Sequence, residues 1–452
     1  MKKYLPYLPV VLLLAGCSRP SADEADRISP LYPDPITAKL DTVEGYKINP
    51  FTGDSVEPII LSTGEVLRSG VALEVKGEYA GVPAYQPWVV PAGNPIVHKV
   101  YETEFPMPDN LAKVPVNEEL LVKKHYDPEA RATFINSTGD TIQTGTPVPL
   151  VGVTIPFVKS RPVKALLPRM RDNAIKNIQY LDVDQGLNSS VITCLLEDRR
   201  GNIWIGTNSG GISFYDGVCF NHITKSEGLS SNNVTAVFED RHGNIWIGTD
   251  YGLNKFDGES FVRFTEKEGL TNNSVTSLTG DSQGNIWIGL YGGGVSRYDG
   301  ELATYLTTNE GLSNNTVNSV FEDTNGNIWI TTWGGGVNRF NGHSFLHITE
   351  KDGLCNNYPL SIIQDDHGNL WFGTTAGVNM YDGESLTFFS EKEGLSSSYV
   401  LSVSKDSQGD VWFCTQGRGV TRLSGKTFFH YTEKEGLSSD YTHRFLEDSY
   451  GN

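Results

Sequence analysis

Residues 242–270 read HGNIWIGTDYGLNKFDGESFVRFTEKEGL, and close copies of this stretch recur through the second half of the 452-residue chain. A Gly-Asn-apolar-Trp core anchors the copies and places tryptophans at Trp204, Trp246, Trp287, Trp329, Trp371 and Trp412. The differences between these numbers are 42, 41, 42, 42 and 41. A second motif, Glu/Asp-Gly-Leu, recurs at Gly186 (after Gln185), Gly228, Gly269, Gly311, Gly353, Gly394 and Gly436. A fixed period of this kind indicates a repeat architecture.

The residues within each copy favour strands over helices. A period near 42 is typical of helical arrays or of four-stranded propeller blades. Short runs with apolar residues at every second position, such as 244–249, are separated by Gly-Asn, Asp-Gly and Gly-Gly turn signals. No window offers helical spacing, and each Gly would cost a helix about 1 kcal/mol. We therefore expect four strands per copy, named A to D, which in the second copy are 234–239, 244–249, 253–256 and 260–265.

The repeat resembles the two-component regulator propeller family. The motif that carries the resemblance is Leu-x-x-x-x-Val, then Asp-x-x-Gly-Asn-Ile-Trp-Ile-Gly-Thr, then Gly-Gly-Val-x-x-Tyr-Asp-Gly, over roughly residues 175–452. The resemblance implies an all-β propeller of four-stranded blades. It also implies the extracytoplasmic sensor region of a bacterial histidine kinase or hybrid two-component system.

Composition narrows the partners and the chemistry. The formal net charge is −18, which disfavours nucleic acid and anionic lipid as partners of the folded surface, since both need Lys and Arg to neutralise phosphate. We expect no cofactor. Four cysteines fall at unrelated repeat positions, so we expect buried free thiols rather than a metal site, with one disulfide left open: Cys194, Cys219, Cys355 and Cys414.

The first residues predict a targeting segment outside the fold. Lys2 and Lys3 precede an apolar run over 5–16 that is too short to span a bilayer, which needs about 20 residues. The run ends in Leu-Ala-Gly-Cys17, which resembles a bacterial lipobox, with cleavage before the Cys and lipidation of its thiol. We therefore expect a signal peptide over 1–16. The anchor would hold the protein in the envelope of a Gram-negative bacterium, facing the periplasm or the exterior.

The next segments carry no part of the repeat. Residues 17–45 are acidic and Pro-rich and are predicted to be a linker. Residues 46–165 are Pro-rich with short Val/Ile runs, and 62–70 and 137–145 are similar stretches that both predict hairpins turning at Thr-Gly-acid. We expect a β-rich accessory region here, which either wraps the propeller or forms an extended stalk.

The two ends of the repeat region, 166–452, suggest how the ring closes. The stretch 175–184 lines up with a strand D that has no strands A to C before it. The stretch 440–447 lines up with a strand A, and the chain stops at Asn452 in mid-motif. We expect a truncated chain and a seven-bladed ring, whose last blade combines these two strands and lacks about 20–25 residues. A kinase region beyond residue 452 is left open.

Residues that recur at the same position in every copy are expected to have structural roles. The six tryptophans lie on strand B and are predicted to bury about 150–250 Å² each between blades. The turn aspartates, such as Asp240, are expected to be turn formers, and the acids before Gly-Leu, such as Glu268, a solvated rim. Strand A carries small residues at one position, except that the last copy has Arg444, which either pairs an anion in the channel or marks a distorted blade.

One face of the propeller is predicted to bind the ligand. The B–C turns and the D–A linkers lie on the same face, and their residues vary while their frames repeat. Aromatic rings beside amides and acids suit a sugar, a peptide or another small molecule. The candidate ligand-binding residues are Asp250, Tyr251, Tyr291, Trp333, Arg418, Tyr358, Tyr399, Tyr441 and Arg444. Ordinary polar turn chemistry is the alternative.

Two classes of function follow. The first is a sensor that binds an extracytoplasmic ligand and reports it to a signalling partner or to a further C-terminal region. These 452 residues contain no kinase motif, so no enzymatic activity is expected of them. The second is a propeller enzyme, a lyase or a glycoside-active one, although no Ser-His-Asp order or paired carboxylates stand out. A passive lipoprotein scaffold is a third, weaker alternative.

Overall fold

A computed structural model describes residues 47–48, 55–56, 59–60, 66–67 and 104–452, except 173, 175 and 177. The chain divides into one compact unit of residues 16–99 and another of residues 1–15 and 100–452. The expected signal peptide, the Cys17 anchor and the linker 17–45 lie outside the described residues. In the unit 16–99, β1 (Lys47–Ile48) pairs with β2 (Ser55–Val56), and β3 (Ile59–Ile60) pairs with β4 (Val66–Leu67).

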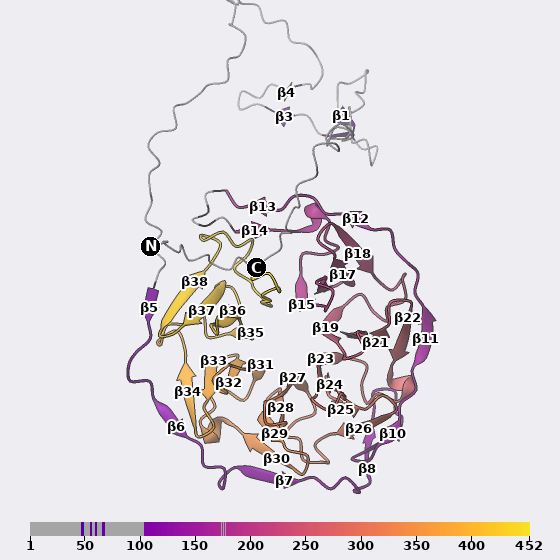
Figure 1. Cartoon of the computed structure of the whole chain (residues 1–452), viewed down its shortest axis with the longest axis vertical. Helices are drawn as coiled ribbons and strands as arrows, with labels where there is room; N and C mark the ends of the chain where they lie inside the picture. Colours follow the sequence, from indigo (N-terminus) through magenta and orange to yellow (C-terminus); the bar gives the residue numbers. More distant parts are fainter. Residues whose placement is uncertain are drawn as a thin grey trace, which may run out of the picture. The chain divides into compact units, whose positions relative to one another are not determined.

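The larger unit contains six antiparallel four-stranded sheets, arranged as the blades of a propeller (Figure 1). The expected all-β propeller is therefore confirmed, with six complete blades. From A to D, the strands are β15 (Ile192–Glu197), β16 (Ile203–Thr207), β17 (Ile212–Tyr215) and β18 (Cys219–Ile223) in blade one; β19 (Val234–Glu239), β20 (Ile245–Thr249), β21 (Gly252–Phe256) and β22 (Ser260–Phe264) in blade two; β23 (Val275–Gly280), β24 (Ile286–Leu290), β25 (Gly294–Tyr298) and β26 (Leu302–Leu306) in blade three; β27 (Val317–Glu322), β28 (Ile328–Thr332), β29 (Gly336–Phe340) and β30 (Ser344–Ile348) in blade four; β31 (Pro359–Gln364), β32 (Leu370–Thr374), β33 (Gly377–Tyr381) and β34 (Ser385–Phe389) in blade five; β35 (Val400–Lys405), β36 (Val411–Thr415), β37 (Val420–Ser424) and β38 (Thr427–Tyr431) in blade six.

Each blade has a fifth, outermost strand that comes from the segment before the repeats. These short strands, which we call the belt, pair in reverse order with blades six to one: β5 (Glu104–Pro106), β6 (Lys113–Pro115), β7 (Val122–His125), β10 (Val148–Pro149), β11 (Val153–Pro156) and β12 (Val163–Lys164). Figure 1 shows the belt running around the outside of the ring. Of the two arrangements expected for this region, its described part therefore wraps the propeller and is not a stalk.

One apolar side chain after each belt strand fixes the belt to its blade. Leu150, for example, donates its N–H to the Glu301 carbonyl at 3.1 Å and is almost fully buried in the core shared by blades two and three. The equivalent anchors in the other blades pack in the same way: Met107, Val116, Tyr126, Phe157 and Ala165. Pro106, Pro115 and Pro156 end belt strands, and a proline cannot donate to a further strand, so the sheet edges are protected.

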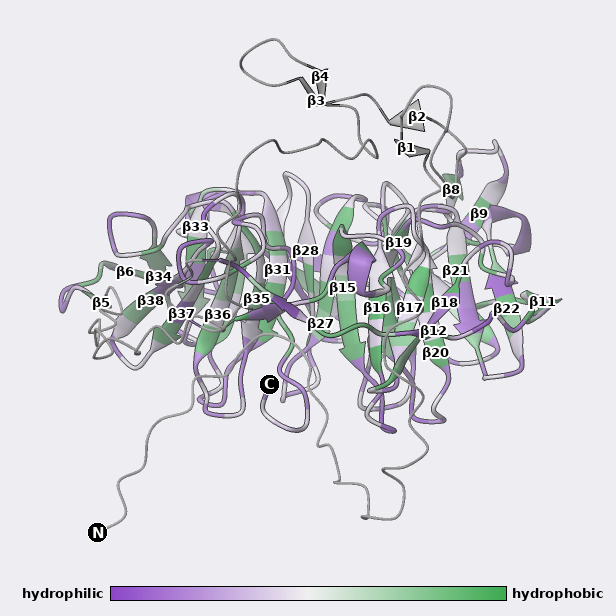
Figure 2. Ribbon diagram, turned by 90° about the horizontal axis from the view of Figure 1, so that it is seen from above, coloured by the Kyte–Doolittle hydropathy of each residue, from purple (hydrophilic) through white to green (hydrophobic). Residues whose placement is uncertain are grey.

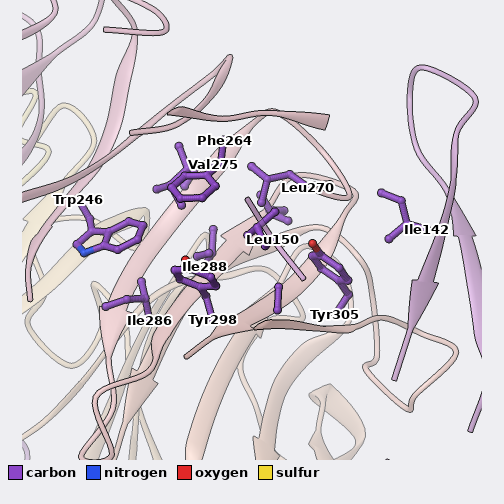
Figure 3. Packing of buried hydrophobic residues seen from close by; sticks show 13 residues of the cluster. Ile142, Leu150, Trp246, Phe264, Leu270, Val275, Ile286, Ile288, Tyr298 and Tyr305 are labelled. Carbon is purple, nitrogen blue, oxygen red and sulfur yellow. The ribbon is translucent and has the colours of Figure 1, made fainter. Parts of the chain in front are cut away.

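The tryptophan that recurs on strand B packs against the neighbouring blade. Figure 3 shows Trp246, from β20 of blade two, beside Ile286 and Tyr298 of blade three, and the Trp246 and Tyr298 rings lie 6.0 Å apart. Trp204, Trp287, Trp329 and Trp371 each cluster with the next blade in the same way. The prediction that the six indoles are buried is confirmed, since each is 2–4% exposed. Five of them lie between blades, and Trp412 packs on Phe445 of the closing segment.

The turn aspartate holds the indole in place. In blade two, one oxygen of Asp240 accepts the Trp246 indole N–H at 2.9 Å and the Asn244 side chain at 2.8 Å, while the other accepts the backbone N–H groups of His242 and Asn244. All six blades repeat the contact between aspartate and indole, at 2.7–2.9 Å. Asp240 is therefore more than a turn former, because it orients the side chain that joins two blades.

Polar side chains on strand A also join the blades on their inner side. Thr193, Thr235 and Thr276 donate their hydroxyls to the carbonyl of the first strand-A residue of the following blade, at 2.6–2.7 Å. Asn318 makes the same contact to Pro359 at 2.8 Å. Blades five and six have Leu360 and Leu401 at this position, so the contact is absent there. This contact therefore joins the first four pairs of neighbouring blades, and blades five and six are joined instead by the Val403 N–H, which donates to the Ser361 hydroxyl at 3.1 Å.

The closing segments differ from the expectation. The strand D expected over 175–184 is reduced to β14 (Gln179–Tyr180), which pairs with β13 (Arg169–Met170). The strand A expected over 440–447 is not a strand. The physical reason is that strand A pairs with strand B of its own blade, and the described chain has no strand B there.

These segments nevertheless connect blade six to blade one. The Phe445 ring stacks on Trp412 of blade six at 4.4 Å. Ser449 donates its N–H and its hydroxyl to Glu197 of blade one, at 2.7 and 2.6 Å. The same pair of bonds, from Ser282 to Glu322, joins blades three and four. The closing segments therefore link blade six to blade one through contacts of the ordinary inter-blade type.

Acid should unfold this propeller. Burial alone would raise the pKa of Asp240, but hydrogen bonds from Asn244, Trp246 and the turn outweigh it and hold that pKa below its ordinary value, as they do for Asp198, Asp281 and Asp365. Because these pKa values are lowered by folding, their stabilisation is present above the unfolded pKa of about 3.9 and is lost as the pH falls through the folded values. Tryptophan fluorescence during acid titration should report cooperative unfolding below about pH 4. Stability that stays constant from pH 5 to pH 2 would contradict this assignment.

Candidate functional site

The B–C turns and the D–A linkers meet on one face of the ring, which we call the tip face. The B–C turns are residues 208–211, 250–251, 291–293, 333–335, 375–376 and 416–419. The backbone N–H of Asp250 donates to the Asn233 carbonyl in its own blade, and that of Gly252 donates to Asn273 of the next blade. Equivalent pairs of bonds occur in blades one, three, four and six, and blade five has the first of the two, so the turns are held to the linkers by backbone bonds around the ring.

Large aromatic side chains stand exposed on the tip face. Trp333 is 45% exposed, whereas Trp329, four residues earlier, is 2% exposed. Tyr251 and Tyr291 are also exposed on B–C turns, and Tyr358 and Tyr441 on D–A linkers. Tyr399 is half-buried. Four of the five exposed rings, Tyr251, Tyr291, Trp333 and Tyr358, follow consecutive blades from two to five, and Tyr441 lies after blade six.

Two of the candidate aromatic residues contact the B–C turn of the preceding blade. The Trp333 and Tyr358 rings lie 5.0 Å apart in an edge-to-face arrangement, and Tyr358 also lies over Gly334. In the same way, Tyr441 lies over Gly417, beside the exposed Arg418. Both glycines have positive φ, at 81° and 75°, so a side chain there would be strained and would also meet the ring.

The remaining candidates lie in different surroundings. Asp250 is exposed and accepts the side-chain amide of Asn233 at 2.7 Å. The Arg444 guanidinium donates to the Leu401 carbonyl of blade six at 3.4 Å, and Arg444 lines the cavity between blades six and one together with Tyr441. The structure therefore brings Trp333 and Tyr358 together, and it places Tyr441 both over the turn that carries Arg418 and beside the cavity that Arg444 lines.

A hairpin of the belt lies beside the tip face. The sequence predicted the hairpin but not its position. β8 (Ala132–Ile135) and β9 (Thr141–Thr144) are the expected hairpin around residues 137–145, and its tip binds the D–A linker of blade two. Ser137 donates to both carboxylate oxygens of Glu266, at 2.6–2.7 Å, and Thr144 donates to Glu310 at 2.6 Å. Figure 2 shows the two strands rising past the edge of the blades. The hairpin therefore stands beside the tip face at blades two and three.

The acids before Gly-Leu are not the solvated rim that we expected. Glu268 accepts the N–H and the hydroxyl of Thr265 at 2.8 and 2.5 Å, which caps the 3-10 turn η3 (Glu266–Glu268). Related caps occur at η2 (Val183–Gln185) and η4 (Glu350–Asp352). The Thr-x-x-Glu spacing is a readable capping signal, so this role could have been predicted. The acids shape the linkers and leave the aromatic rings as the variable feature.

The described residues offer little that resembles catalytic or metal chemistry. Within residues 104–452, apart from 173, 175 and 177, no three His, Cys, Asp or Glu side chains gather as a metal site requires. Burial lowers the pKa values of His222, His347 and His430, and one ring nitrogen of each is engaged by a hydroxyl or a carbonyl. No helix in this part of the chain has the length and apolar character that crossing a membrane requires.

Comparison with known families identifies the repeat. Six segments match a family described as "Two component regulator propeller": residues 186–209, 228–251, 269–292, 311–334, 353–376 and 394–417. Each match begins at the Gly of Glu/Asp-Gly-Leu and ends in the B–C turn, so it includes strands A and B and the tip. Among curated proteins, no sequence matches the chain.

Several solved structures share the propeller fold. One is the extracellular domain of a protein described as a hybrid two-component system from B. thetaiotaomicron, with a TM-score of 0.49 and 24% identity, covering 73% of this chain and 41% of that one. Another is virginiamycin B lyase from Staphylococcus aureus, at 0.44 and 15%, covering 52% and 82%. A third is PorZ, a surface component of the type-IX secretion system of Porphyromonas gingivalis, at 0.47 and 16%, covering 69% and 52%. The chain thus spans less than half of the first of these structures.

Proposed function

This chain belongs to the two-component regulator propeller family, and on that premise we propose that its ring binds an extracytoplasmic oligosaccharide through the tip face. The observation that carries the proposal is the set of exposed aromatic rings on consecutive blades. Exposed apolar surface that gathers in one region of a soluble protein is typical of binding sites. The flat faces of sugar rings pack well against Trp and Tyr, and neighbouring amides and acids can bind their hydroxyls.

The arrangement of the rings favours an extended ligand over a single sugar. Tyr251, Tyr291 and Trp333 come from blades two, three and four, and Tyr358 continues the row into blade five. The β8–β9 hairpin stands beside the start of this row, at the linkers of blades two and three. An oligosaccharide could contact several rings in turn. A signalling partner would then respond to occupancy of the tip face, and no catalytic group is required for that role.

We also propose that the ring accepts a seventh blade, for which strands A and D are partly in place. Ile178 lies against Gly436 of blade six, as Phe261 of blade two lies against Gly228 of blade one. Phe445 stacks on Trp412 on the inner side. Between these two segments is a largely apolar cavity of about 530 Å³, lined by residues such as Leu437 and by strands of blade one. Two further strands, B and C, would fill this cavity and pair with both segments.

The third proposal concerns the attachment of the propeller to the cell. The Leu-Ala-Gly-Cys17 sequence after an apolar run suits lipidation of the Cys17 thiol, and a lipid anchor would place the ring outside the cytoplasm. A polar, Pro-containing segment over 17–45 follows, and such a tether would let the ring reach ligands away from the membrane surface.

Trp333→Ala and Trp329→Ala should separate ligand binding from stability. Calorimetric titration with cellohexaose, xylohexaose and mannohexaose should show saturable binding of at least one of them, weakened about tenfold or more by Trp333→Ala. Trp333→Ala should change the free energy of unfolding by less than about 0.5 kcal/mol. Trp329→Ala should cost about 3–5 kcal/mol, because it leaves a cavity between blades. Equal destabilisation by the two substitutions, or no effect of Trp333→Ala on binding, would contradict the face assignment.

If the ring accepts a seventh blade, adding strands B and C for that blade should stabilise the protein. A copy of residues 203–215, which form β16 and β17, would be appended after Asn452, and Tm compared with that of the original chain. We expect Tm to rise by about 4 °C or more, because apolar side chains fill the cavity and two sheet edges become paired. A matched copy with Ser in place of its Trp should give a smaller rise. Identical Tm values for all three proteins would rule out the seventh blade.

Lipidation of Cys17 can be tested in growing bacteria. The full chain should incorporate an alkyne-tagged fatty acid and fractionate with membranes, because a diacylglyceryl group, joined to the Cys17 sulfur as a thioether, would carry the labelled acyl chains and anchor the protein. Cys17→Ser should abolish both the label and the membrane fractionation, whereas Cys219→Ser should change neither. Unlabelled wild-type protein in the soluble fraction would contradict the lipid anchor.

A further inference from the structure

A second cleft lies on the face opposite the tip face, between blades one and two. Its volume is about 270 Å³, and its lining includes the A–B turn of blade one, the C–D turn of blade two and the belt around Phe157. In an antiparallel four-stranded blade, A–B and C–D turns lie at the end opposite to B–C turns and D–A linkers. The cleft is therefore separate from the aromatic rings of the proposed oligosaccharide site.

The cleft exists because blade one departs from the repeat beside its tryptophan. In blades two, four and six, the strand-C residue paired with the Trp has a charged end that lies over the indole: Lys255, Arg339 and Arg422. In blade one the paired residue is Phe214, with its ring 4.9 Å from that of Trp204. The next position outward is the short Asn221, where blade six has Phe429. A long side chain is thus replaced by a flat ring with open space beside it.

Aromatic rings form much of the wall of this space. Phe214 is half-buried, so part of its surface is available. Phe157 enters from the belt and lies edge-to-face on Phe256 at 5.0 Å. A dry apolar cavity of about 150 Å³ is enough to hold benzene, so about 270 Å³ holds one ring with a polar substituent.

The three carboxylates that line the cleft already have partners. Asp198 accepts the Trp204 indole N–H at 2.8 Å and the side-chain amide of Asn202. Glu239 accepts the backbone N–H of Arg199 at 2.9 Å, and the Arg199 guanidinium lies 4.0 Å away. Asp257 accepts two N–H groups and a hydroxyl within its own turn. These acids therefore have few remaining positions from which to bind a ligand cation.

Three other polar groups that line the cleft, those of Lys159, Arg200 and Asn221, are by contrast unused. Lys159 and Arg200 are exposed, and among the described residues no ion pair or hydrogen bond engages either charged group. The Asn221 amide also has no bond within the described part of the chain. Two unpaired cations beside an aromatic wall are complementary to a flat molecule with an acidic group.

We propose that this cleft binds a small aromatic carboxylate. Its ring would lie against Phe214 and Phe157, its carboxylate would pair with Lys159 and Arg200, and the Asn221 amide would bind a ring substituent. The site would be independent of the tip face, so one propeller would hold two ligands of different chemistry on its two faces.

The test uses 4-hydroxybenzoate as the probe, with tyramine as its cationic counterpart and phenol as the uncharged one. Calorimetric or NMR titration of the full chain should show saturable binding of 4-hydroxybenzoate and much weaker binding of the other two. Lys159→Glu with Arg200→Glu should weaken binding about tenfold or more, because charge-assisted hydrogen bonds are lost. Lys225→Glu is the control, since it changes an exposed charge on the opposite face and should leave binding unchanged.

A second substitution tests whether binding requires the open space of the cleft and not only its positive charges. Asn221→Phe introduces the side chain that blade six has at this position, so it should fill the cleft and abolish binding while Tm is maintained. Failure of 4-hydroxybenzoate to bind, preferential binding of tyramine, or unchanged binding by Asn221→Phe would each overturn the proposal.

Discussion

The hydrogen bond between a turn aspartate and a tryptophan indole is the interaction on which this ring depends. It links residues six apart in the same blade, at 2.7–2.9 Å, and it recurs in all six blades. A buried carboxylate is costly unless several donors surround it, and in blades one to five the Asn side chain, the turn N–H groups and the indole supply them. Blade six has Asp410 in place of the Asn, and there the N–H groups and the indole are the donors. The same bond fixes the orientation of the ring that packs on the next blade. Each Asp-x-x-Gly-Asn-x-Trp unit therefore determines both a turn and an inter-blade contact.

The belt gives the repeat array a second set of connections. Neighbouring blades in a solenoid or propeller normally contact only each other. Here one segment pairs with blades six to one in turn, and its anchors enter the inter-blade cores. Glu118 of the belt also pairs with Arg339 of blade four at 2.6 Å. The blades are thus tied together on the outside by the belt and on the inside by strand A, and the turns of the tip face are left free to vary.

Local patterns predicted the blades well, and long-range contacts were not predictable. Alternating apolar residues and Asp-Gly turns placed strands A to D of blade two within one residue of β19–β22, because those strands pair with near neighbours. The belt strands are only two to four residues long, and their partners lie up to 325 residues away, as for Glu104 and Phe429. No periodicity reports such a pairing. The cleft beside Phe214 was also missed, because it results from a departure from the repeat that becomes visible only when the strand register is known.

The exchange rates of the indole N–H protons test the central claim most directly. Hydrogen exchange followed by NMR on tryptophan indole resonances would measure them individually in the folded protein. If the aspartate–indole bonds hold the blades, the N–H protons of the six strand-B tryptophans should exchange only through opening of the ring, and they should be strongly protected as a group. Trp333, which is 45% exposed, should exchange rapidly. Rapid exchange at the strand-B tryptophans, at the rate of Trp333, would contradict the account.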